Sequence, residues 1–340
     1  MKPVISIVIP VYKTPVESYI KCLESIVRQA SVRYSIEVVL AFDGNPSAEL
    51  KETTLRYSGS LALNELYLRH AGVSQARNSG IAAASGEWIM FVDADDSLPD
   101  NSCDALLDVA QSTAADIVFG DFNVLYPSGQ TERKVSAAVD LPSLKPEIVK
   151  HQVLIPDKSM GLVWGKLFSL QFLKENHLEF DSRVAVGEDA LFIFNAVSKA
   201  RVLAYCPEAV YNYCRTAEST VTKFKADYPD RVLASMDSMK RSIRLLGDDS
   251  CLLEFNTYVL FHLLLINVHY IFNPASEWKE AERKREFCRI RSLDIFDNAL
   301  KRYRRRDFSL AKRIMLSFLS HRFYLGCRVV SFIRNRQIRS

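Results

Sequence analysis

Acidic side chains gather at one point of the chain. Asp93, Asp95 and Asp96 directly follow the apolar run Trp88–Val92 in the segment WIMFVDADD. Carboxylates this close repel one another unless a cation or donors compensate, and Mg²⁺ or Mn²⁺ binds through one or two carboxylates plus phosphate oxygens. The segment therefore suggests a divalent metal site, although Asp96 or Ser97 could equally be the N-cap of a helix.

A second acidic pair, Glu188 and Asp189, follows Gly187 and opens the apolar run ALFIFNA. A carboxylate can act as a general base that removes a proton from a hydroxyl group within hydrogen-bond reach. Acidic residues are also favoured in the first turn of a helix, where the helix dipole is positive. The pattern alone leaves both interpretations open.

A run rich in small residues, HAGVSQARNSGI at 70–81, lies between the two acidic clusters. Ala76 and Gly80 favour close packing of a helix against a sheet. Arg77 is unusual at such a position, and its planar, permanently charged guanidinium suits a nucleotide or a carboxylate. Arg77 is therefore a candidate binding residue.

The elements that must position these residues alternate along the first hundred residues. Apolar, β-branched runs predict strands at 5–12, 36–42, 63–68 and 87–94. Helical spacing of apolar residues predicts helices at 16–30, 47–58 and 74–85. This alternation predicts an α/β fold with a mostly parallel sheet, whose ligands bind beyond the carboxyl ends of the strands. Tyr12, Asp43 and Asp93 to Asp96 stand at those ends.

The later part of the chain changes character. Strands are predicted near 116–125 and 202–206, with a polar, proline-punctuated stretch at 126–160 between them, and from about 226 the periodicity is helical. We therefore predict a domain boundary near residue 225. The apolar run at 258–272 has 15 residues and includes two histidines. It is shorter than the about 20 residues of a membrane span, which favours a core helix.

The composition is that of a folded protein: 340 residues, 48% hydrophobic and 25% charged, which predicts roughly two domains. Seven cysteines, an odd number without CxxC spacing, argue against a disulfide framework or a structural zinc site. The N-terminal segment MKPVISIVIPVY lacks the pattern of a signal peptide. We therefore expect a cytoplasmic location.

The net charge of +4 is unevenly distributed, because the C-terminal tail is strongly basic. Residues 301–340 hold 12 Lys and Arg against the single acid Asp307, a net +11, so residues 1–300 carry −7. Apolar clusters alternate with the basic residues, as in amphipathic helices that lie on an anionic membrane. We favour attachment to the membrane surface over the alternative, a helical appendage that packs its apolar face on the α/β domain that precedes it.

An ordered series of motifs, IVIPVYKT, FDGNPS, GVSQARNSGIAAASGEWIMFVDADD, WGKLF and GED, resembles glycosyltransferase family 2. These are inverting, nucleotide-sugar-dependent enzymes with a GT-A fold, and the resemblance covers about residues 4–225. It implies a GT-A catalytic domain over 1–225, with nucleotide-sugar binding in about 1–100 and the acceptor side in 101–225. A helical C-terminal region at 226–340 would carry the basic amphipathic tail.

The resemblance also implies roles on the nucleotide side. Pro10, Tyr12 and Asp43 match the positions that hold the nucleobase, Tyr12 by stacking and Asp43 by accepting the uracil imide hydrogen. Arg77 matches an arginine near the nucleotide, and Asp93 matches the ribose-side carboxylate. One departure is Phe42, which stands where the family often has a first aspartate.

On the reaction side, Asp95 matches the family's metal ligand on the diphosphate, Asp189 its catalytic base, and Glu188 an acceptor-binding or orienting group. Trp164 and Lys166 match a motif beneath the acceptor site, for which core packing and function are equally good interpretations. Arg215 and Ser219 resemble a Tyr-x-Arg…Ser segment of bacterial members and are candidate acceptor or diphosphate contacts.

The resemblance thus implies an inverting, Mn²⁺- or Mg²⁺-dependent glycosyltransferase. It would move a hexose or N-acetylhexosamine from a UDP-sugar to a hydroxyl of a lipid-linked, lipopolysaccharide or capsule glycan, on the inner face of the cell membrane. A glycosidase would instead need two carboxylates that flank the bond, and no nucleotide site. The alternative function is a nucleic-acid- or anionic-surface-binding protein with a non-catalytic nucleotide-binding domain. That alternative leaves Asp189 without a role, so we expect no nucleic-acid partner.

Overall fold

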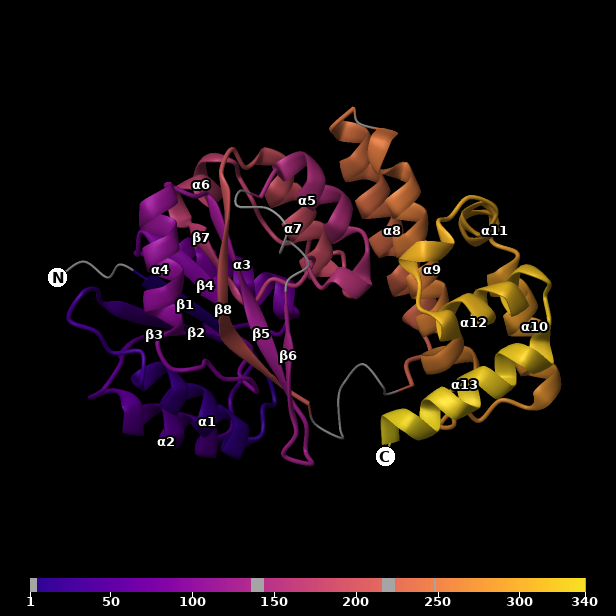
Figure 1. Cartoon of the computed structure of the whole chain (residues 1–340). Coiled ribbons are helices and arrows are strands. Elements are labelled where there is room, and N and C mark those ends of the chain that lie inside the picture. The colour runs from indigo at the N-terminus through magenta and orange to yellow at the C-terminus, as the bar shows by residue number, and fades with distance from the viewer. Residues whose placement is uncertain (1–4, 136–143, 216–223, 248, 340) are drawn as a thin grey trace. The chain divides into compact units, whose positions relative to one another are not determined.

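The computed structural model describes residues 5–135, 144–215, 224–247 and 249–339. The chain divides into two compact units (Figure 1). The first runs up to Lys150 and resumes from Met160 to Arg215, and the second comprises His151–Ser159 and the chain beyond Arg215. The first unit is α/β and the second is helical. The boundary near residue 225 stays a prediction.

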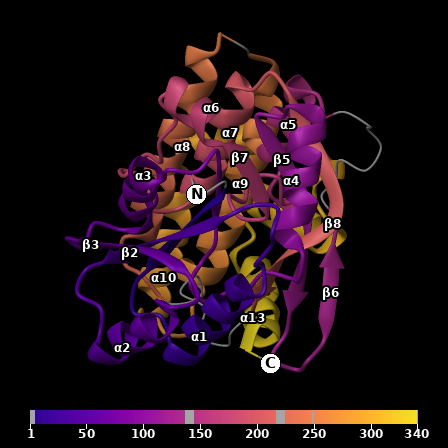
Figure 2. The same ribbon diagram turned by 90° about the vertical axis from the view of Figure 1, so that its left-hand side faces the viewer.

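The first unit is built on a mixed sheet of eight strands. These strands are Ile5–Val11 (β1), Ile36–Asp43 (β2), Ala62–Leu68 (β3), Trp88–Phe91 (β4), Ile117–Leu125 (β5), Thr131–Lys134 (β6), Lys166–Ser169 (β7) and Leu203–Cys214 (β8). Their order is β3-β2-β1-β4-β7-β5-β6, and β8 pairs with β5. Figure 2 shows β3 at one edge, with β6 and β8 toward the other.

Most strand pairs are parallel, as the sequence predicts. β1 pairs in parallel with β2 and β4, β2 with β3, and β5 with β8, whereas β7 is antiparallel to β4 and β5. The central strands are buried on both faces, which explains why they read as continuous apolar runs. The predicted strands and helices of the first hundred residues are confirmed, with ends that differ by a few residues.

Helices flank this sheet. Their bounds are Val16–Val27 (α1), Ala48–Tyr57 (α2), Val73–Ala83 (α3), Ser102–Thr113 (α4), Leu170–Glu175 (α6) and Glu188–Lys199 (α7), while Pro146–Val153 (α5) runs into the second unit. The small residues of α3 allow a close approach to the sheet. A Cβ atom at Gly80 would lie 2.2 Å from Cγ1 of Val8 in β1, so only glycine fits there. This contact fixes the height of Arg77 above the strands.

The second unit is made of helices: Tyr228–Leu245 (α8), Leu252–Ile266 (α9), Glu280–Arg291 (α10), Asp294–Lys301 (α11), Leu310–Ser320 (α12) and Tyr324–Arg339 (α13). A π-helical turn, Asn267–Ile271, extends α9. By length and composition the stretch Asp249–Ile271, with mean hydropathy 1.6, could cross a membrane, but 67% of its apolar window is buried. That burial agrees with the core helix predicted at 258–272.

Candidate active site

Three strand ends bring the predicted nucleotide residues to one edge of the sheet. Val11 of β1 pairs with Phe42 of β2, and Val8 pairs with Phe91 of β4. Because these strands are parallel, the residues that follow them share the carboxyl edge, as the sequence predicts. These residues are Tyr12, Asp43 and Asp93, while Pro10 lies half-buried in β1 itself.

Asp43 is buried and organises one end of this edge. Its carboxylate accepts hydrogen bonds from the backbone amides of Ala71 (2.7 Å) and Gly72 (3.0 Å), and it pairs with Nδ1 of His70 (2.9 Å). The His70 ring stacks on Tyr12, with ring centroids 4.3 Å apart, and Tyr12 remains 45% exposed. Sequence reasoning did not assign His70, although its place at the head of the HAGVSQARN run was a signal.

Arg77 is 3% exposed and joins two segments that are far apart in sequence. From α3 its guanidinium donates to Oδ1 of Asp93 (2.9 Å) and to Oδ1 of Asp189 (2.6 Å), and it lies 3.7 Å from Oε1 of Glu188. Burial by itself lowers the pKa of Arg77, but the three carboxylates outweigh it and raise that pKa. Both acidic clusters therefore meet at one buried cation.

The acids at the start of α7 are largely buried. Burial raises the pKa of Asp189 while the charge of Arg77 opposes the rise, and burial and the charge of Asp189 raise the pKa of Glu188 to about 7. Gly187, with φ of 76°, is the N-cap of α7, so both acids occupy its first turn. The helix-start interpretation therefore holds and is compatible with a role for these acids in a reaction.

The three acids after β4 have different surroundings. Asp96 is 2% exposed and accepts hydrogen bonds from the Tyr211 hydroxyl and the Cys214 amide, both at 2.7 Å, and burial raises its pKa to about 8. It therefore anchors β8. The alternative that Asp96 or Ser97 caps a helix is wrong, because the next helix, α4, begins only at Ser102.

Asp95 is exposed, and no ion pair to its carboxylate is found within the described ranges. Partial burial, followed by the charge of Asp93, raises the pKa of Asp95. In the part of the chain that the structure describes, no three His, Cys, Asp or Glu side chains form a cluster that could hold a metal by themselves. The donor set still suits Mg²⁺ or Mn²⁺, which commonly takes one or two carboxylates and completes its shell with phosphate oxygens and water.

The remaining predicted residues come from the acceptor half. Trp164 is buried and stacks on Tyr211 and Tyr213, with centroid distances of 4.6 Å and 5.7 Å. Lys166 is buried in the sheet. Arg215 lies over the ring of Tyr126, 5.5 Å from its centroid, and its role stays a prediction. Ser219 lies outside the described residues.

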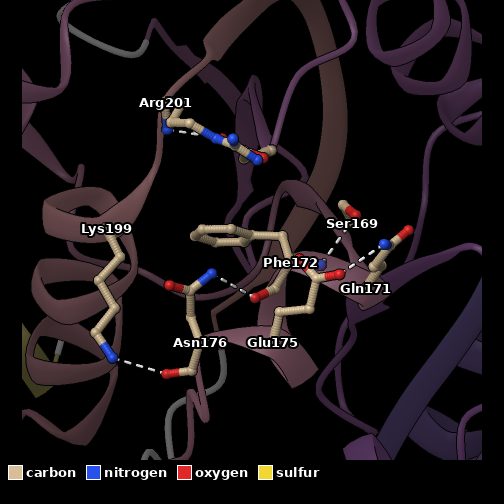
Figure 3. A pocket seen from close by; sticks show the side chains of 8 residues that line it. Ser169, Gln171, Phe172, Glu175, Asn176, Lys199 and Arg201 are labelled. Atoms are coloured by element: carbon tan, nitrogen blue, oxygen red, sulfur yellow. Dashed lines mark hydrogen bonds between the residues drawn. The ribbon is translucent and has the colours of Figure 1, made fainter.

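A separate polar cavity of about 540 Å³ lies elsewhere in the first unit. Ser169 on its wall pairs with Trp88 at the amino end of β4, so the cavity is at the end of that strand opposite to Asp93. Figure 3 shows polar groups that hydrogen-bond to one another, Gln171 to Glu175 and Lys199 to the Asn176 carbonyl. The wall is formed by Asp116, Ser169, Gln171, Phe172, Glu175, Asn176, Lys199 and Arg201. It includes none of the predicted site residues.

Comparison with known proteins finds several similar chains. The family model described as "Glycosyl transferase family 2" matches residues 6–190. The putative glycosyltransferase EpsH of Bacillus subtilis is 24% identical over 99% of this chain and 97% of its own length. The succinoglycan biosynthesis protein ExoO of Rhizobium meliloti is 26% identical over 72% of this chain and 70% of its own. Among solved structures, S. aureus TarS 1-349 in complex with UDP-GlcNAc has a TM-score of 0.65 at 18% identity and covers 98% of this chain and 92% of that one.

The buried ion-pair cluster predicts a pH-dependent loss of stability. In Arg77→Met the neighbouring carboxylates lose their cation, so their pKa values rise and their ionised forms destabilise the fold as pH increases. We expect the free energy of unfolding to fall by about 3–5 kcal/mol near pH 8 and by less near pH 5. Denaturant titrations at both pH values measure this. The control Arg183→Met, which removes an exposed pair with Asp181, should leave stability nearly unchanged; an equal loss in both variants contradicts the prediction.

Proposed function

The chain belongs to glycosyltransferase family 2, and we propose that it transfers a sugar from a UDP-sugar to a glycan hydroxyl in surface-polysaccharide assembly. The observation that carries this proposal is the Arg77 cluster. One guanidinium holds Asp93, at the nucleotide edge of the sheet, and Asp189, at the start of α7, within hydrogen-bond distance. A nucleotide-binding edge and a candidate base are thus parts of one site.

Three similarities support the donor and the process. TarS, whose fold resembles that of this chain, has been solved with UDP-GlcNAc, which favours a UDP-sugar and either a hexose or an N-acetylhexosamine. ExoO is named for succinoglycan biosynthesis, and EpsH is named a putative glycosyltransferase. We therefore propose a polysaccharide acceptor, either lipid-linked or part of a lipopolysaccharide or capsule glycan.

The nucleobase would bind against Tyr12 and Asp43, beside Pro10. Tyr12 has an exposed ring for stacking. Among the residues that the structure describes, Asp43 Oδ1 accepts one hydrogen bond, from Ala71, so one lone pair remains for a uracil imide N–H. Phe42 lies directly before Asp43 and stacks on Tyr67, 5.2 Å away. Where many family members have a first aspartate, this chain therefore has an aromatic side chain that packs on Tyr67.

Inversion requires one displacement at the anomeric carbon. In the proposed reaction, the acceptor hydroxyl attacks that carbon, its proton passes to Asp189, and the bond to the diphosphate oxygen breaks as UDP leaves. The hydrogen bond from Arg77 favours the ionised form of Asp189, which a base must have before the reaction. Glu188, with no hydrogen bond from Arg77, would orient the acceptor.

Asp95, with Asp93 beside it, would hold Mn²⁺ or Mg²⁺ against the diphosphate. The bound ion would act as a Lewis acid that stabilises the charge on the departing group. Arg77 keeps one oxygen of Asp93 occupied, and the other stays available for the ribose or the ion. Arg215 is proposed as a contact to the acceptor or the diphosphate.

We further propose that the tail attaches the protein to the inner face of the cell membrane. Its helices α12 and α13 bury one face, which includes Met315, Leu316, Leu319 and Cys327, within the helical unit. The opposite side of α13 exposes Leu325, Val329, Phe332 and Ile333 at helical spacing. Residues 308–340 hold seven basic and no acidic side chains. An apolar stripe with surrounding positive charge suits an anionic lipid surface.

The base assignment predicts the behaviour of two variants. Asp189→Asn should lose about 10²- to 10⁴-fold in turnover while it still binds UDP, because nucleotide binding does not need this carboxylate. Glu188→Gln should chiefly weaken acceptor binding and raise KM. Turnover, UDP affinity and melting temperature are measured on the same preparations. Near-normal turnover in Asp189→Asn, with a severe loss in Glu188→Gln, would move the base to Glu188.

The metal assignment predicts that Asp95→Ala folds normally, since its side chain is exposed, but loses turnover. UDP affinity in Mn²⁺ should fall by at least about tenfold and should no longer respond to EDTA. Isothermal titration with UDP, with and without EDTA, measures this. The matched control Asp100→Ala, another exposed acid of the same loop, should behave as wild type. Full activity of Asp95→Ala, or of wild type in excess EDTA, rules the assignment out.

The membrane proposal predicts that replacing Leu325, Val329, Phe332 and Ile333 with Gln lowers binding to phosphatidylglycerol vesicles by at least about tenfold, because apolar burial is lost. Vesicle co-sedimentation measures this. Deleting the tail is a poorer test, because its other face is core. The control variant Leu245→Gln removes an exposed leucine of α8 and should bind normally. Unchanged vesicle binding contradicts the proposal, and so does a stripe that instead mediates self-association in sedimentation.

A further inference from the structure

Lys166 is a buried basic residue to which the proposed reaction gives no role. It begins β7, inside the sheet between β4 and β5, and is 4% exposed. No carboxylate of the described residues lies within ion-pair distance of it. Its ammonium donates to the Leu162 carbonyl and lies 4.9 Å from the centroid of the Phe119 ring. Burying an ammonium group costs free energy that an apolar side chain of similar size would not cost. The presence of a lysine at this position therefore needs an explanation.

The hydrogen bond from Lys166 holds a turn that reaches the acidic cluster. Val163, next to Leu162, directs its backbone amide at Oδ2 of Asp189 over a long 3.4 Å. Gly165, at φ of 66°, closes the turn and accepts a hydrogen bond from the Gly120 amide of β5 at 3.0 Å. The turn is therefore fixed to Lys166 at one end and to β5 at the other. Its Val163 amide is presented to the Asp189 oxygen that Arg77 does not bind.

The charges around Asp189 are unbalanced without Lys166. The groups that face this acid are Arg77 from α3, Asp93 after β4, and Glu188 beside it on α7. The single positive charge of Arg77 thus faces three carboxylates. Lys166 supplies a second positive charge from the sheet, and that charge lowers the pKa of Asp189. Burial lowers the pKa of Lys166 to about 7, and the negative charge of Asp189 counteracts part of that lowering.

We propose that Lys166 is a positioning residue for Asp189. Its ammonium holds the Leu162–Val163 peptide against the carboxylate, and its charge favours the ionised form of that acid. The proposal rests on the proposed function, in which Asp189 is the base. It assigns Lys166 an electrostatic task in place of mere packing beneath the acceptor site.

The test is a titration of the Asp189 carboxyl by NMR of protein with ¹³C-labelled aspartate. The Asp189 signal is the one lost in Asp189→Asn, and a Glu188→Gln background removes the acid that titrates with it. In Lys166→Met the midpoint should rise by about one pH unit, because a nearby positive charge is gone. Lys166→Arg, which keeps the charge, should shift it much less. The control Lys174→Met removes a lysine that donates to the Ala84 carbonyl away from the acids, and should leave the midpoint in place.

A second measurement follows turnover against pH. The acid limb of kcat/KM should move upward in Lys166→Met in step with the NMR midpoint, while UDP affinity stays unchanged. If Lys166→Met does not fold, Lys166→Gln takes its place, since the amide can still donate to Leu162 but carries no charge. An unmoved midpoint in the folded variant overturns the proposal. A wild-type protein that transfers no sugar counts against the proposed function, whereas the NMR result still decides the role of Lys166.

Discussion

The Arg77 guanidinium lies buried among three carboxylates, and the arrangement of the site depends on that balance. Asp93 comes from the end of a strand, and Asp189 and Glu188 come from the first turn of a helix more than ninety residues later. Unpaired, these acids would repel one another at low dielectric. Because a guanidinium has a fixed planar geometry, it also sets where the carboxylates lie. The same contact thus stabilises the fold and sets the distance between Asp93, at the carboxyl edge of the sheet, and Asp189, the proposed base.

The contact between Arg77 and the acids is possible because α3 has small residues where it packs on the sheet. Gly80 allows the helix to approach Val8, and Ala76 is fully buried beside Arg77. A larger side chain would lift the helix and withdraw the guanidinium from the acids. The close packing of α3 on the sheet therefore determines how near the positive charge of Arg77 lies to the acids. Lys166, at the start of β7, adds a second positive charge that acts on Asp189 from the sheet.

The two helices of the tail have two different apolar faces. One face of α12 and α13 belongs to the core of the helical unit, and the other exposes an apolar stripe. In the sequence of a helix with two apolar faces, apolar residues form clusters and do not recur with the period of about 3.6 that one apolar face produces. Only the packing separates the residues that stabilise the unit from those that are available to a surface.

The sequence by itself determined the α/β fold and which acids stand at strand ends, because parallel strands read as apolar runs and their carboxyl ends share one edge. For Glu188 and Asp189 it offered the first turn of a helix as one of two interpretations, and the structure confirms that position. Tertiary structure alone decided that Asp96 turns inward to Tyr211 and Cys214 while Asp95 faces solvent, and that His70 joins Tyr12 to Asp43. The physical reason is that the direction of a side chain beyond a strand end, and its distance to a residue far along the chain, depend on how separate elements pack. Local patterns carry no information on either.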